Sequence, residues 1–99
     1  MKHFCEVCKK ETVLELMPDY SSSGIWCNNC GVNYANPKES LSLLPDWLIR
    51  FIQGWNDIWE LSVQKEVNPL KFTTPIDQIG RQLLEYINKY YECIIWTDE

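Results

Sequence analysis

The sequence has little of what catalytic sites usually require. It contains a single histidine, His3, and only four glycines. No glycine-rich segment could cradle a phosphate group, and no nucleophile is paired with a recognisable general base. These absences predict that the protein is not an enzyme, and no small-molecule substrate is evident. His3 itself is expected to be a solvated residue near the N-terminus.

Positive charge is also scarce. The nine lysine and arginine residues are outnumbered by fourteen aspartate and glutamate residues, which gives a formal net charge of −5. Residues 1–36 and the remainder of the chain each carry more acidic than basic side chains. Because a phosphate backbone binds basic surfaces, this composition argues against nucleic acid as a partner.

Long apolar runs are absent as well. No segment approaches the roughly 18 apolar residues that a membrane span needs. The opening segment MKHFCEVC has no apolar stretch of the kind that forms a secretory signal. We therefore expect a cytoplasmic protein without membrane association. Thiols stay reduced in the cytoplasm, where paired cysteines more often bind metal than form disulfides.

The sequence does contain two matched cysteine pairs. Cys5 and Cys8 form the first C-x2-C pair, and Cys27 and Cys30 form the second. The eighteen residues between the pairs fall within the usual range for a tetrahedral metal site. The fifth cysteine, Cys93, is predicted to be a half-buried apolar residue and not a ligand.

Three chemistries fit these pairs, and one Zn²⁺ per chain held by four thiolates is favoured. The alternatives are iron in the same geometry, as in rubredoxin-like electron carriers, and thiol–disulfide exchange. Zinc with four thiolate ligands has no open coordination position, so it would stabilise structure and catalyse nothing. Metal binding contributes on the order of 10 kcal/mol in small zinc modules, which are too short to bury a sizeable core.

On these two pairs, residues 1–36 resemble a zinc ribbon. The resemblance implies a small N-terminal module of short antiparallel strands, and it says little about the task of the protein. Gly31 follows the second pair and can adopt the positive φ that such a turn requires. Lys9 stands in the matching place after the first pair, where the common pattern has glycine, so it must accept strain or use a variant turn.

The residues between and after the cysteine pairs favour a β-hairpin and a further short strand. Glu11–Met17 is rich in strand formers, and Pro18–Gly24 has the composition of a loop. Val32–Ala35 can add a third short strand beside this hairpin.

After a linker at residues 37–44, the pattern changes to that of two amphipathic helices. They are expected at about residues 45–67 and 75–96. The short connection makes them antiparallel neighbours, so residues 45–99 would form a helical hairpin. The predicted fold class is α+β, with a small zinc ribbon followed by an antiparallel pair of long helices. The sequence leaves open whether ribbon and helices pack together as one domain.

An aromatic stripe runs along the first predicted helix, formed by Trp47, Phe51, Trp55 and Trp59. At helical spacing such a stripe favours core packing, and partner binding is the alternative. Asn56 falls among polar residues on the opposite face. The apolar arc is wider than the roughly 100° that a surface helix needs. This surplus predicts a protein partner or a homodimer.

Together these features predict a non-enzymatic zinc-binding protein-interaction module, acting as a small regulator or adaptor. The first alternative is a nucleic-acid-associated or transcription-related zinc-ribbon factor. The second is a rubredoxin-like iron electron carrier.

Overall fold

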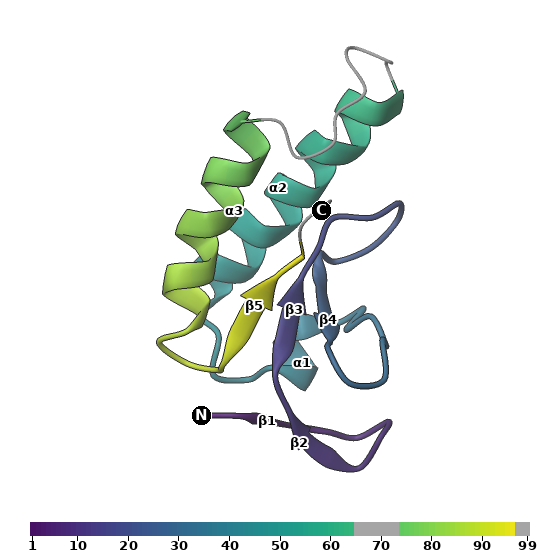
Figure 1. Ribbon diagram of the computed structural model, residues 1–99, viewed down its shortest axis with the longest axis vertical. Coiled ribbons are helices and arrows are strands. Elements are labelled where there is room, and N and C mark those ends of the chain that lie inside the picture. Colours follow the sequence, from purple (N-terminus) through teal and green to yellow (C-terminus); the bar gives the residue numbers. More distant parts are fainter. Residues whose placement is uncertain (65–73, 97–99) are drawn as a thin grey trace.

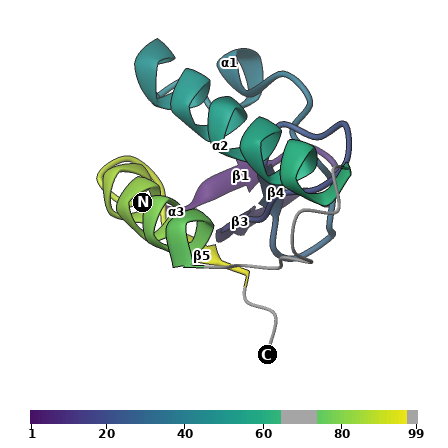
Figure 2. The same ribbon diagram turned by 90° about the horizontal axis from the view of Figure 1, so that it is seen from above.

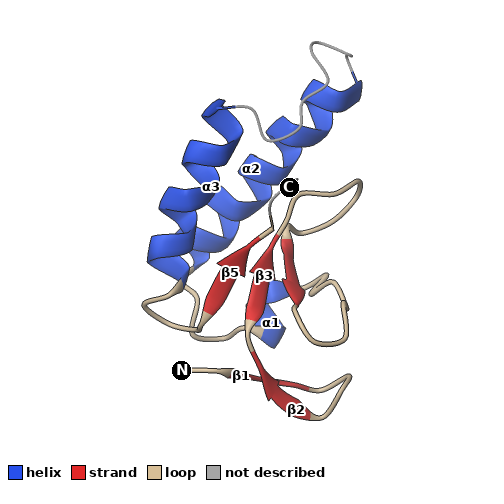
Figure 3. Cartoon of the chain, in the orientation of Figure 1, coloured by secondary structure: helices blue, strands red, loops and turns tan. Residues whose placement is uncertain are grey.

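The computed structural model describes residues 1–64 and 74–96, and its fold is mixed α+β (Figures 1 and 3). This confirms the predicted class in outline. In chain order, the elements are β1 (His3–Cys5), β2 (Lys10–Thr12), β3 (Leu14–Leu16), β4 (Ile25–Cys27), α1 (Pro37–Ser40), α2 (Asp46–Gln64), α3 (Thr74–Ile87) and β5 (Cys93–Ile95).

The strands form two small sheets. β1 pairs antiparallel with β2 to make the first sheet. In the second sheet, β3 is central and pairs antiparallel with β4 and parallel with β5. β5 comes from the C-terminal end of the chain, so the second sheet joins the two halves of the sequence (Figure 1).

The prediction of a third strand at Val32–Ala35 is wrong. This segment contributes only a single bridge, between Asn33 and Trp26. The side-chain amide of Asn33 donates to the carbonyl oxygen of Ile25 at 3.0 Å, and the N–H of Tyr34 donates to the same oxygen at 3.1 Å. The chain therefore turns beside β4 and does not extend along it.

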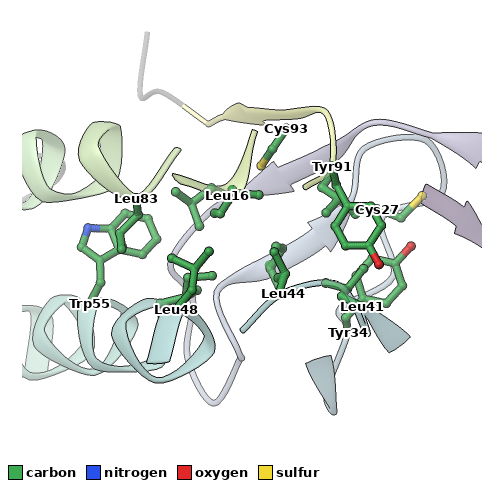
Figure 4. Packing of buried hydrophobic residues seen from close by; sticks show 14 of the residues in the cluster. Leu16, Cys27, Tyr34, Leu41, Leu44, Leu48, Trp55, Leu83, Tyr91 and Cys93 are labelled. Carbon is green, nitrogen blue, oxygen red and sulfur yellow. The ribbon is translucent and has the colours of Figure 1, made fainter. Parts of the chain in front are cut away.

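The core lies between the three-stranded sheet and the two long helices, which pack side by side (Figure 2). Its residues are apolar side chains from both halves of the chain, and several point toward one another in Figure 4. The fully buried members include Leu14, Leu16, Ile25, Leu41, Leu48, Ile52, Trp55 and Ile87. Residues 37–44, predicted as a linker, contain α1 and place Leu41 and Leu44 in this core.

The second helix is shorter than predicted. It was expected over about residues 75–96, but α3 ends at Ile87 and the chain returns as β5. Asn88 explains the end of the helix, because its amide nitrogen donates to the carbonyl oxygens of Leu84 at 2.9 Å and Cys93 at 3.0 Å. Its amide oxygen accepts the N–H of Cys93 at 3.1 Å. Such side-chain bonds to the backbone compete with helix continuation.

The first helix begins at Asp46, close to the predicted start at residue 45. Its predicted end at residue 67 lies outside the described residues. Within residues 1–64 and 74–96, no helix has the length and apolar character needed to cross a membrane.

The buried polar residue Asn56 joins α2 to the loop that follows β3. Its side-chain oxygen accepts the N–H of Asp19 and the hydroxyl of Ser22, each at 2.9 Å. Its amide nitrogen donates to the carbonyl oxygen of Asp19 at 3.0 Å. Asn56 is fully buried, although its helical position placed it on the predicted polar face. The loop at residues 19–22 covers that face.

Replacing this residue should therefore destabilise the fold. We expect Asn56→Ala to lower the free energy of unfolding by about 2–3 kcal/mol, because it leaves buried polar groups of the loop without partners. Urea denaturation would measure the change. Gln53→Ala, on the same helix, also removes a hydrogen bond to this loop, from its amide nitrogen to the Ser22 carbonyl oxygen at 3.2 Å, but because the Gln53 side chain is exposed it should change the free energy by about 1 kcal/mol or less. Equal losses in the two variants would contradict this role for Asn56.

Candidate metal centre

The two cysteine pairs form turns with the same backbone geometry. In the first turn the N–H of Lys9 donates to the carbonyl oxygen of Cys5 at 2.8 Å. In the second, the N–H of Gly31 donates to the carbonyl oxygen of Cys27 at 3.0 Å. Lys9 has φ of 59° and Gly31 has φ of 80°, so both lie in the left-handed region. This confirms the predicted conformation of Gly31 and the strain predicted at Lys9.

These turns bring together the four cysteines expected to be ligands. All four sulfur atoms lie within 4.8 Å of one another. The Sγ–Sγ distance is 3.8 Å between Cys5 and Cys30 and 3.9 Å between Cys8 and Cys27. A tetrahedral ion with metal–sulfur bonds of about 2.3 Å has sulfur–sulfur edges of about 3.8 Å. The cluster therefore has the size and donor set of a four-thiolate metal site.

The inner part of the cluster favours thiolates. Cys5 and Cys27 are buried, whereas Cys30 is exposed. Burial opposes ionisation of Cys27, but the N–H groups of Cys30 and Asn29 and the hydroxyl of Thr12 outweigh it and lower its pKa to about 6. The Thr12 hydroxyl lies 3.4 Å from the Cys27 sulfur, and the Cys30 N–H donates to that sulfur at 3.5 Å.

The outer part of the cluster resists further negative charge. The N–H of Val32 favours the Cys30 thiolate, but partial desolvation and the three neighbouring sulfurs outweigh it and raise the pKa of Cys30 to about 12. Four adjacent thiolates repel one another, and a cation between them would offset that repulsion. The chemistry of this donor set fits a bound divalent metal ion.

Tyr34 adds a polar group to the wall of this site. Its hydroxyl is buried and has no hydrogen-bond partner of normal geometry within residues 1–64 and 74–96. The hydroxyl lies on the side of the ring toward Cys27 (Figure 4). Burial raises the pKa of Cys5, but the Tyr34 hydroxyl and nearby backbone N–H groups outweigh burial and lower it. A thiolate held by a metal ion would give this hydroxyl an acceptor.

His3 lies beside the cluster and is not simply solvated as predicted. Its ring packs edge-on against Tyr34, with centroids 5.2 Å apart, and against Tyr91, with centroids 5.5 Å apart. Burial lowers the pKa of His3, and the nearby Glu6 carboxylate only partly opposes this. The set of four sulfurs is complete without this imidazole.

Tyr34 and Tyr91 offer a matched test of the hydroxyl near the sulfurs. Both are buried and both contact His3, but the Tyr91 hydroxyl already accepts the N–H of Leu43 at 3.1 Å. We expect Tyr34→Phe to weaken metal binding by about tenfold, the lower end for partners of metal ligands. It should also shift the thiolate-to-metal charge-transfer band of the Co²⁺-substituted protein to lower energy. Tyr91→Phe should change neither; equal effects would contradict a role specific to Tyr34.

The four aromatic residues of the predicted stripe separate into different environments. Trp55 is buried in the core and its indole N–H donates to the carbonyl oxygen of Ile76 at 2.8 Å. Trp59 is partly buried and meets Tyr20 edge-on. Trp47 and Phe51 are exposed by 44% and 63%. Core packing thus applies to Trp55, while Trp47 and Phe51 are available at the surface.

The exposed members line an apolar groove of about 500 Å³ between α2 and α3. Trp47 meets Phe51 and Tyr86 edge-on, with ring centroids 5.9 Å and 5.3 Å away. Other apolar groove residues are Ile58 from α2 and Ile79 and Leu83 from α3. The spacing of Ile79, Leu83 and Tyr86 at three and four residues places these groove residues on one apolar arc of the second predicted helix.

Sequence reasoning missed two contributors to the metal centre. Thr12 and Tyr34 each lie four residues after a cysteine pair, but each approaches a cysteine of the other pair, Thr12 the sulfur of Cys27 and Tyr34 that of Cys5. Cys93 is fully rather than half buried, and burial raises its pKa to about 12. This agrees with the prediction that it is an apolar residue and not a ligand.

Comparisons with protein-family models, with characterised proteins and with solved structures find no match to this chain.

Proposed function

We propose that the chain is a non-enzymatic, zinc-stabilised protein-interaction module, a small cytoplasmic regulator or adaptor. A zinc ribbon at the N-terminus would hold an antiparallel pair of helices, and the helices would bind protein. The observation that carries the proposal is the apolar groove between α2 and α3, which remains exposed although the core of the described residues is well filled.

Zinc is the proposed metal because the four sulfurs offer a closed tetrahedral set. Each strand around the site is only three residues long, so backbone pairing alone gives the N-terminal sheet little stability. Iron would fit the same four thiolates as an electron carrier.

The groove has the character of a binding surface for protein. Six large apolar side chains on α2 and α3 are between 40% and 63% exposed: Trp47, Phe51, Ile58, Leu61, Ile79 and Tyr86. Side chains of this size, about half exposed, present on the order of 500 Å² of apolar surface. A contiguous patch of a few hundred Å² typically marks an interaction site.

Charge supports protein over nucleic acid as the partner. The chain has a net charge of −5, and the proposed site adds thiolates. The residues around the groove are aromatic and aliphatic, with no cluster of lysine and arginine among those that line it. A transcription-related role would therefore act through a protein contact within a larger assembly.

The experiment is affinity capture of the full chain from its native cells, comparing Phe51→Glu with the wild type. We expect specific proteins to be recovered with the wild type and lost with Phe51→Glu, because a charge in the groove prevents apolar contact. Glu39→Lys, on the exposed surface of α1, is the control and should recover the same proteins. Recovery of nucleic acid, or identical proteins from all three, would contradict the proposed function.

A further inference from the structure

We propose that the occupant of this groove is a second copy of the chain, with α2 packed antiparallel against α2 of that copy across Gly54. The inference rests on the proposed function, since it assumes that the groove binds protein. It specifies the partner and the packing direction, neither of which can be deduced from the groove alone. Three features of α2 carry it: the spacing of its exposed apolar side chains, their symmetry, and the signs of the flanking charges.

The spacing is that of a coiled-coil seam. The positions on the exposed side of α2 are Trp47, Phe51, Gly54, Ile58 and Leu61. They alternate at intervals of four and three residues, the pattern of the a and d positions of a heptad. The core-facing side of the same helix holds Leu48, Ile52 and Trp55, which are buried within the chain. One helix therefore carries two apolar faces, and only one of them is covered.

The seam is symmetrical about its centre to within one residue. Gly54 has apolar neighbours at three and four residues on its two sides, Phe51 and Ile58, and again at seven residues, Trp47 and Leu61. A two-fold axis at Gly54 would place Gly54 beside Gly54 and Trp47 beside Leu61 of the second copy, and would bring Phe51 and Ile58 of opposite copies to within one residue of the same level, as an interface between identical surfaces requires. A side-chain carbon placed on Gly54 would meet no atom within 4 Å, so the helix surface there is open to close approach.

The charges beside the seam favour the antiparallel direction. Arg50 and Asp57 are exposed and lie seven residues apart, on one stripe of α2 and about 10 Å along its axis. Within residues 1–64 and 74–96, neither residue takes part in an ion pair. If two copies of α2 run antiparallel across Gly54, Arg50 of each copy lies within one residue, about 1.5 Å along the axis, of the level of Asp57 of the other. Both contacts then join opposite charges, and paired charges of this kind set orientation in coiled coils.

The second helix completes the surface. Ile79 and Tyr86 of α3 are 40% and 43% exposed and form the far wall of the groove. Phe51 of a second copy, 63% exposed on the seam, is a side chain of suitable size to enter it. Two such pairs of helices would form a four-helix arrangement with the sheets outside. Each copy would bury on the order of 500 Å² of apolar side chain, toward the roughly 800 Å² per partner of a standard interface.

The test is sedimentation equilibrium of the purified metal-loaded protein across a dilution series, with charge variants of α2. We expect the wild type to dimerise. Arg50→Asp and Asp57→Arg should each raise the dimer dissociation constant about tenfold or more, because each places like charges at both contacts. Mixing the two single variants should restore dimers, since opposite charges then meet again. Glu39→Arg, with the same charge change as Asp57→Arg but on α1, should leave the constant unchanged.

Two results would overturn the inference. One is a wild type that stays monomeric at every concentration. The other is a dimer that Phe51→Glu or the charge variants do not weaken, or that the mixture does not restore. Circular dichroism would verify that each variant is folded. Because this experiment uses the purified chain alone, its failure leaves protein capture from cells as a separate test of the proposed function.

Discussion

Removing one ligand of the metal centre is expected to unfold the protein, because the strands beside the cysteines share a sheet and a core with the C-terminal part of the chain. Cys27→Ser should abolish binding of one Zn²⁺ per chain, because a serine hydroxyl does not replace the thiolate of this buried member of the four-sulfur cluster. Structural zinc contributes on the order of 10 kcal/mol in small modules, as much as the whole stability of a typical domain. Metal analysis and circular dichroism would measure both losses.

The matched control for this prediction is Cys93→Ala. Cys93 is also a buried cysteine, but it lies on β5, outside the cluster of four sulfurs. Its replacement should leave one metal ion per chain and reduce stability only as a small core truncation does, by about 1–2 kcal/mol. A metal-free Cys27→Ser protein with an intact fold would contradict a structural role for the site.

The second large effect is expected on the stability of the fold, where two tryptophans of the same helix should differ. Trp55→Ala should lower the free energy of unfolding by about 3–5 kcal/mol, because it leaves a cavity in the core. It also removes the bond from the indole N–H to the Ile76 carbonyl oxygen, at 2.8 Å. Trp47→Ala should cost about 1 kcal/mol or less, since that side chain is 44% exposed and contributes mainly edge-on ring contacts.

Urea denaturation at low protein concentration would compare these variants as monomers. The order of the two variants should be reversed for self-association: Trp47→Ala should weaken the dimer more than Trp55→Ala, since Trp47 lies on the proposed seam and Trp55 does not. We therefore expect Trp47→Ala to remain folded and to dimerise more weakly. Similar losses of stability in the two variants would show that both rings belong to one core, and would contradict the division of the helix into a buried and an exposed face.

The metal centre could be predicted from the sequence because its signal is local. Two residues separate the cysteines of each pair, and that spacing forces a tight turn in which both sulfurs point the same way. This turn requires a positive φ at the residue after each pair. Gly31 accepts that conformation readily, and Lys9 accepts it with strain. Thr12 and Tyr34 could not be predicted, because each follows one cysteine pair in the sequence but contacts a sulfur of the other pair, and only the folded arrangement of the two turns brings them together.

The extent of the second helix could not be predicted because its end depends on a distant pairing. The apolar residues up to Ile95 fit a helical period, so the pattern favours helix throughout residues 75–96. In the structure, Ile94 and Ile95 instead pair with Glu15 and Leu16 of β3. Isoleucine also favours strands, and only the presence of β3 decides between the two conformations.

The division of the aromatic stripe into buried and exposed residues could not be predicted for the same reason, because it also depends on distant parts of the chain. A wide apolar arc shows that α2 buries much of its surface, but it does not show which part faces its own core. Gly80 of α3 settles this near Trp55, because a side-chain carbon at Gly80 would lie 2.9 Å from the indole ring. The loop that bonds to Asn56 settles it on the other side of the helix. Neither neighbour can be identified from the helix sequence.

Native mass spectrometry of the purified protein at tens of micromolar tests the central claim most directly, since one mass reports both metal and partner. The claim is that four cysteines and a zinc ion organise a domain whose exposed α2 face binds a second copy. The predicted result is an assembly of two chains and two zinc ions. A folded chain without metal, or with iron, would contradict the proposed zinc centre. A single chain with one zinc ion would contradict the proposed interface.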